Sequence, residues 1–140
     1  MTTEALTQSH LRFGWLLLGS FALLGLVLEG LHGFKQEWYL LVPVRRSHLL
    51  LAHVHGVAFG LLHVLLAGTV AMLPHWKGGM RAIASSAFKS ASLLIPIGFL
   101  GSGLFVADGR PGIAIVLLAP GILLLLIAAL LTARATSSFA

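Results

Sequence analysis

Residues 48–73 read HLLLAHVHGVAFGLLHVLLAGTVAML, and this stretch decides the fold. It holds no Asp, Glu, Lys or Arg, and it stops just before Pro74. At about 1.5 Å per residue, a helix of this length exceeds the roughly 30 Å hydrocarbon core of a bilayer. An apolar run this long is typical of a transmembrane helix, so the stretch predicts a membrane span.

Three further segments are also long and apolar enough to cross a bilayer, at about 11–32, 82–107 and 111–133, and the charged residues they hold are Arg12, Glu29 and Lys89. The connections between the four segments are short. The last one, Asp108-Gly109-Arg110, is a tight turn that makes the third and fourth helices antiparallel neighbours. We therefore predict an all-α fold, an integral membrane bundle of four transmembrane helices in which residues 1–140 form a single membrane domain.

The composition supports a membrane protein and excludes several other classes. Apolar residues make up 58 % of the chain and charged residues 9 %, against about 25 % charged in a soluble domain. No basic run with interleaved aromatic residues occurs, so we expect the lipid bilayer and no nucleic acid as a partner. The chain has no cysteine, which excludes thiolate metal sites and covalent c-type haem.

The loop charges predict the orientation. The side with both termini and the second connection carries five cations, and the opposite side carries four, namely Lys35, Arg45, Arg46 and Arg110. This difference favours both termini on the cytoplasmic side. Helical spans also point to a bacterial inner membrane.

Small residues and prolines punctuate the predicted spans. Gly56 and Gly60 form a small-xxx-small pair, which lets helix backbones approach closely in a membrane. Pro96 and Pro120 are expected to kink the third and fourth helices.

Histidine and glutamate supply the candidate site. Ionisable groups inside a membrane are costly and indicate function by default. The first span leaves the membrane on the side where the second enters, so several of these residues should gather near one leaflet boundary, with His63 deeper. The gathered residues are Glu29, His32, His48, His53 and His55.

The residues alone leave three kinds of site open. Imidazole with one carboxylate suits a copper or zinc ion, with ligands drawn from Glu29, His32, His48, His53 and His55. A b-type haem needs axial histidines, and a bis-histidine site requires His32 or a partner subunit. The same groups could instead relay protons, or simply hydrogen-bond across helices. Because residues advance by about 100° along a helix, the rings of His53 and His55 should point about 200° apart and serve different sites.

The segment from Ser47 to Gly60, with His53-Val54-His55, resembles the His-x-His helix of haem-copper oxidase subunit I and of small four-helix proteins grouped with that superfamily. The resemblance implies that His53 and His55 are haem ligands on opposite faces of one helix. The chain has far fewer spans, no adjacent His-His pair and no His-x-x-x-Tyr helix. The resemblance therefore implies a reduced relative with one haem or metal site, or an accessory subunit, and not oxygen reduction by this chain alone.

From these observations we predict a small membrane protein that binds haem b or a copper or zinc ion for electron or proton transfer. His53, His55 and His63 are the expected cofactor ligands. The alternatives are a non-catalytic subunit of a larger membrane complex, and a transporter or channel formed by a homo-oligomer. Whether the protein is an enzyme stays open.

Overall fold

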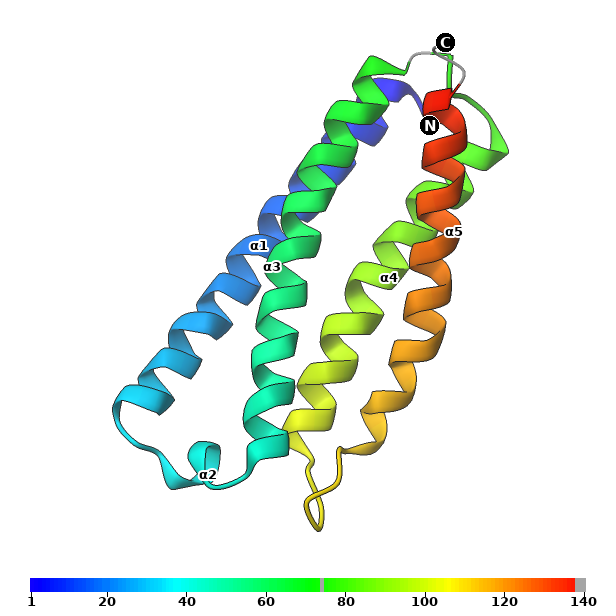
Figure 1. Cartoon of the computed structure of the whole chain (residues 1–140). Coiled ribbons are helices and arrows are strands. Elements are labelled where there is room, and N and C mark those ends of the chain that lie inside the picture. The colour runs from blue at the N-terminus through cyan, green and yellow to red at the C-terminus, as the bar shows by residue number, and fades with distance from the viewer. Residues whose placement is uncertain (74, 138–140) are drawn as a thin grey trace.

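The computed structural model describes residues 1–73 and 75–137, and its secondary structure is helical (Figure 1). Four helices are long and apolar enough to cross a membrane: α1, α3, α4, and the run formed by a 3₁₀ helix and α5. The all-α fold with four membrane-spanning helices is therefore confirmed. The elements are α1 Thr3–Gly33, α2 Glu37–Leu40, α3 Pro43–Met72, α4 Gly79–Leu104, the 3₁₀ helix Ile113–Leu117 and α5 Leu118–Thr136.

The first two spanning helices begin earlier than their apolar runs predict. The hydroxyl of Thr2 accepts a hydrogen bond from the Ala5 N–H at 3.2 Å, and this cap starts α1 eight residues before Leu11. Pro43 occupies the first position of α3, where a missing N–H breaks no helical hydrogen bond. Both helices therefore extend past the hydrocarbon core. The expected end of the second span at Pro74 lies outside the described residues.

The last span is divided at Pro120. A continuous α-helix would need the N–H of residue 120 to bond to the carbonyl of Val116, and proline has no N–H. The chain instead forms a 3₁₀ helix up to Leu117 and begins α5 at Leu118. Pro120 then lies in the first turn of α5, where backbone N–H groups have no partner within the helix.

The spanning helices pack in chain order, α1 on α3, α3 on α4, and α4 on α5. Figure 1 shows α1 and α3 close together near the N-terminus and spread apart toward α2. The N-terminus and the end of α5 lie at one end of the molecule, and α2 and the α4–α5 turn lie at the other. This arrangement brings the first and third connections to the same end, as the sequence predicts.

Glycines allow α1 and α3 to touch where they cross. A Cβ placed on Gly14 would lie 2.8 Å from the Gly60 carbonyl oxygen, and one on Gly60 would lie 2.7 Å from the Leu18 nitrogen. The neighbouring Gly56 lies against the ring of Phe21. The predicted close approach of helix backbones is confirmed at Gly60, whereas Gly56 makes room for an aromatic side chain of α1.

The connection from α4 to the 3₁₀ helix covers residues 105–112, and a two-residue turn closed by backbone hydrogen bonds forms its tip. Ala107 and Arg110 exchange bonds of 3.2 and 2.8 Å, and both central residues have positive φ, 49° at Asp108 and 71° at Gly109. Two consecutive positive φ angles define a type I′ turn, which Asp-Gly favours. The predicted tight turn is confirmed.

Candidate functional site

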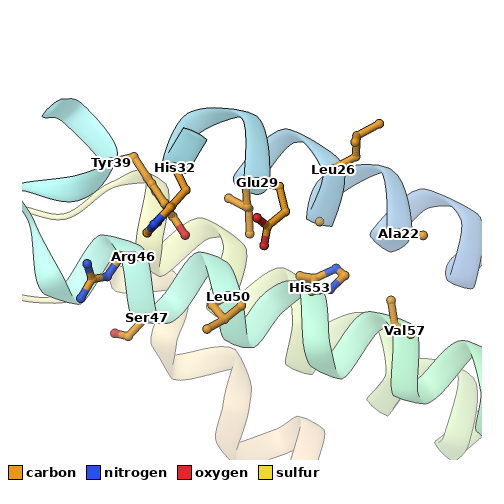
Figure 2. Close-up of a pocket in the computed structure, with 12 residues that line it drawn as sticks. Ala22, Leu26, Glu29, His32, Tyr39, Arg46, Ser47, Leu50, His53 and Val57 are labelled. Carbon is orange, nitrogen blue, oxygen red and sulfur yellow. The ribbon is translucent and has the colours of Figure 1, made fainter. Parts of the chain in front are cut away.

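A groove of about 900 Å³ separates α1 from α3 at the end nearest α2 (Figure 2). Its inner wall is apolar, and its polar residues come from both helices and from α2. Leu26 and Leu50 line it and are 69 % and 49 % exposed, so one side of the groove faces the surrounding lipid. The polar lining residues are Glu29, His32, Tyr39, Arg46, Ser47 and His53.

His53 reaches the groove from α3 with a defined ring orientation. Its Nδ1 lies 2.7 Å from the carbonyl oxygen of Phe21 on α1. A carbonyl only accepts, so Nδ1 carries the proton and Nε2 keeps its lone pair. The ring lies against Gly25, where a Cβ would overlap it. Nε2 has no hydrogen-bond partner among the described residues, and it remains available to a ligand.

Glu29 and His32 extend from α1 toward α3 on the same groove (Figure 2). Both side chains are exposed. No hydrogen bond or ion pair joins them to His53 within residues 1–73 and 75–137. The structure thus places three of the predicted metal ligands along one groove but does not bring them into contact. Over the described ranges, no three His, Asp or Glu side chains converge as a metal-binding group.

His48 and His55 lie on the other side of α3, against α4. His55 Nδ1 lies 2.8 Å from the Leu51 carbonyl oxygen, and its ring centroid lies 5.0 Å from that of Phe99. His48 Nδ1 lies 2.8 Å from Ser102 Oγ. The expected opposite placement of His53 and His55 is confirmed. The five predicted metal ligands are consequently divided between two sides of one helix, which could not share a single ion.

His63 lies in the interior and is already engaged. Its Nδ1 is 2.8 Å from Nδ1 of His10, and its Nε2 is 2.9 Å from Ser92 Oγ. Both histidine side chains have 0 % exposure. In this arrangement His63 has no free nitrogen for a haem or a metal, and its expected role as a cofactor ligand stays a prediction that the geometry does not support.

His10 is the polar residue that sequence reasoning missed. It precedes the apolar run that begins at Leu11, and it was therefore assigned to no span. The buried positions of α1 include Leu6, His10, Gly14 and Leu17, which recur every three or four residues. This helical period indicates that His10 is an interior residue, because it places His10 on the same face as the glycine at the helix crossing.

The residues beside α2 set the electrostatics of the groove entrance. Arg45 stacks on Trp38, with its guanidinium carbon 4.3 Å from the ring centroid, and donates a 2.7 Å hydrogen bond to the Trp38 carbonyl. Tyr39 is buried at 4 % exposure and lines the groove together with Glu29. Burial raises the pKa of Tyr39 above its usual value, although Arg46 nearby opposes the shift.

Comparison with protein-family models, with curated proteins and with solved structures finds no match. The resemblance of the His53-Val54-His55 helix to haem-copper oxidase subunit I therefore stays a prediction. The fold and the groove define the class: an integral membrane protein of four spanning helices with a histidine- and glutamate-bearing groove between the first two.

Proposed function

We propose that this protein binds a b-type haem in the groove between α1 and α3, with His53 as an axial ligand, and uses it for electron transfer. The observation that supports the proposal is the hydrogen bonding of the His53 ring. Its Nδ1–H is held by the Phe21 carbonyl at 2.7 Å and its Nε2 is free. Iron-ligating histidines characteristically donate the second ring nitrogen to a carbonyl, which fixes the ring and raises the basicity of the ligand.

The groove walls suit a flat, largely apolar molecule with an anionic edge. Leucine, alanine and valine side chains line the deeper part, and the absence of a Cβ at Gly25 makes room for the His53 ring. Arg46 lines the polar end, near the membrane surface, and supplies a cation for haem propionates. A bound haem would supply one-electron chemistry at this position.

The remaining polar residues hold and screen the site. Glu29 and His32 lie along the same groove and can exchange protons with the propionates or with interfacial water. Leu26 and Leu50 exclude water from the lipid-facing side.

Haem is favoured over a copper or zinc ion by the number of protein ligands required. A structural or catalytic zinc site takes three or four protein ligands, whereas a haem iron needs only one or two from the chain. The described residues offer no group of three. They do offer an imidazole that lines the groove, is held in place through Nδ1 and has no hydrogen-bond partner at Nε2 among the described residues.

The test is the absorption spectrum of the full chain purified in detergent, oxidised and dithionite-reduced, with metal analysis on the same sample. We expect a Soret band that shifts on reduction, with at least tenfold less haem per chain in His53→Ala. His55→Ala is the matched control, because His55 lies two residues away on the opposite side of α3 and should retain haem.

Four outcomes would overturn the proposal. Haem retained by His53→Ala places the ligand elsewhere, and haem lost only in His55→Ala moves it to the α3–α4 side. Stoichiometric copper or zinc without haem favours the ion site. A protein without any cofactor that purifies with stoichiometric partner chains favours the accessory-subunit alternative.

A further inference from the structure

A continuous chain of side-chain hydrogen bonds crosses the buried interface of α1, α3 and α4. Ser85 Oγ lies 2.9 Å from His10 Nε2, and the two histidines meet through their Nδ1 atoms at 2.8 Å. His63 Nε2 lies 2.9 Å from Ser92 Oγ, which in turn donates to the Lys89 carbonyl at 2.9 Å. Three helices thus contribute to one polar chain inside the membrane-spanning region.

The positions of the protons in this hydrogen-bonded chain follow from its Ser92 end. Ser92 has a single hydroxyl proton, and the Lys89 carbonyl only accepts, so Ser92 Oγ must accept from His63 Nε2–H. His63 Nδ1 is then a lone pair that accepts from His10 Nδ1–H, and His10 Nε2 accepts from the Ser85 hydroxyl. With the protons placed in this way, every donor and acceptor of the chain has a partner. The hydrogen-bond network therefore assigns the tautomers of both histidines.

We infer that His10 and His63 form a site that takes up a single proton from the Ser85 side. In the loading step, a hydronium ion transfers a proton to the lone pair of His10 Nε2: one of its O–H bonds breaks, an N–H bond forms, and water is left. The Ser85 hydroxyl turns from donor to acceptor and receives this N–H. The proton between the two Nδ1 atoms stays shared, so the positive charge is divided between the rings. Unloading reverses the same steps.

The geometry limits the site to one proton. After loading, three ring protons occupy three hydrogen bonds, and no donor is left without an acceptor. A fourth proton would set two N–H groups face to face at 2.8 Å, with two adjacent cations and no acceptor between them. Because the two Nδ1 atoms face each other, their contact can hold one shared proton but not two. The pair can therefore take up one additional proton and not a second.

The path to the site is on one side only. Ser85 is 8 % exposed, whereas His10, His63 and Ser92 have 0 % exposure. At the far end, the Ser92 proton is directed to a backbone carbonyl, which cannot carry it further. The site therefore fills and empties through Ser85 and does not conduct across the bundle.

One cation acts on the pair. Lys89 on α4 acts electrostatically on both rings, and its Nζ lies 2.6 Å from Ser9 Oγ. Among the titratable groups of the described residues, α1 and α3 contribute only the two histidines themselves to this interaction. Burial of both rings disfavours a positive charge on the pair, and the nearby Lys89 cation opposes it further, so the experiment loads the site by acidification. This inference does not rest on the proposed haem site.

The experiment is a ¹⁵N nuclear magnetic resonance titration of the full chain with labelled histidine in lipid nanodiscs, over about pH 3 to 8. At neutral pH we expect a scalar coupling between the two Nδ1 atoms. On acidification, the resonances of His10 and His63 should move together with one midpoint and an uptake of one proton per pair. Asp108→Asn, an exposed position in the turn at the opposite end of the molecule, is the control that should leave this midpoint unchanged.

Two serine variants test the direction of the chain without removing a histidine. Ser85→Ala leaves an unpaired lone pair on His10 Nε2 in the empty state and an unpaired, charged N–H in the loaded state. The unpaired charged N–H costs more, so the midpoint should fall by about one pH unit. Ser92→Ala removes an acceptor that both states use, so its shift should be smaller. Separate midpoints, two protons per pair, or equal shifts from the two serine variants would overturn the inference. If neither ring takes up a proton over the whole pH range, the histidine pair only links α1 to α3, and the inference is wrong.

Discussion

Replacing Gly60 by alanine should force α1 away from α3 and weaken the buried histidine pair. A Cβ at this position would lie 2.7 Å from the Leu18 backbone nitrogen and Cβ, and 2.9 Å from the Gly14 carbonyl oxygen. Two of these atoms belong to the backbone, so they cannot move aside as a flexible side chain can. Reaching an ordinary contact of 3.4 Å requires the helices to separate by about 0.7 Å, the difference between 3.4 and 2.7 Å.

The expected loss of stability follows from the histidine pair, which lies next to this crossing. His63 is one turn from Gly60 on α3, and His10 is one turn from Gly14 on α1. A separation of about 0.7 Å would lengthen the 2.8 Å Nδ1 contact to about 3.5 Å, the limit of a hydrogen bond. Overpacking a tight interface costs about 1–3 kcal/mol, and weakening a buried hydrogen bond adds to it. We expect Gly60→Ala to lower the free energy of unfolding by about 2–4 kcal/mol.

The assay is unfolding of the purified protein in mixed micelles by increasing dodecyl sulfate, followed by tryptophan fluorescence. Gly68→Ala is the matched control. It lies on the same helix with no atom within 4 Å of its Cβ position, so alanine there should be neutral or stabilising by up to about 1 kcal/mol. Equal unfolding midpoints for the two variants would refute the reasoning.

Three further predictions concern the groove and the end of the molecule near α2. Gly25→Ala places a Cβ on the His53 ring and should reduce haem per chain at least tenfold, whereas Gly30→Ala, with open space around it, should not; similar haem contents would contradict this. Gly109→Ala at φ 71° should cost about 1 kcal/mol of stability in the same unfolding assay, and no loss would count against the type I′ turn. Tyr39 is the single tyrosine and burial raises its pKa, so its ultraviolet absorbance titration should have a midpoint above the usual 10.0. The contribution of the buried, neutral phenol to stability is complete below pH 10 and is lost as the pH rises through the folded pKa. A midpoint at 10.0 would contradict the burial of the phenol.

The spans were predictable because they depend on local composition. Long apolar runs with few charges partition into lipid wherever the rest of the chain goes, and the Asp108-Gly109 turn follows from the backbone preferences of its own residues. The helix ends were less predictable. The Thr2 cap and Pro43 carry α1 and α3 past the apolar runs, and Pro120 divides the last span, because hydrogen bonding and not hydropathy decides where a helix starts.

The candidate site was predictable only in part. The helical period separates His53 from His55, and the connectivity brings Glu29 and His32 to the same end of the molecule. Sequence could not show that His53 and Glu29 share a groove while His48 and His55 face α4. That division depends on how α1 and α3 spread apart toward α2, which is a property of their crossing at Gly14 and Gly60.

The sequence by itself determined that this is a four-span membrane protein and that its histidines lie largely on the second span. The physical reason is that partition into lipid and helical periodicity are properties of single segments. Only the tertiary structure decided which histidines have partners. The His10–His63 contact joins residues 53 positions apart, and it exists because two glycines let their helices touch. Such a contact depends on the relative position of two helices, which no single segment specifies.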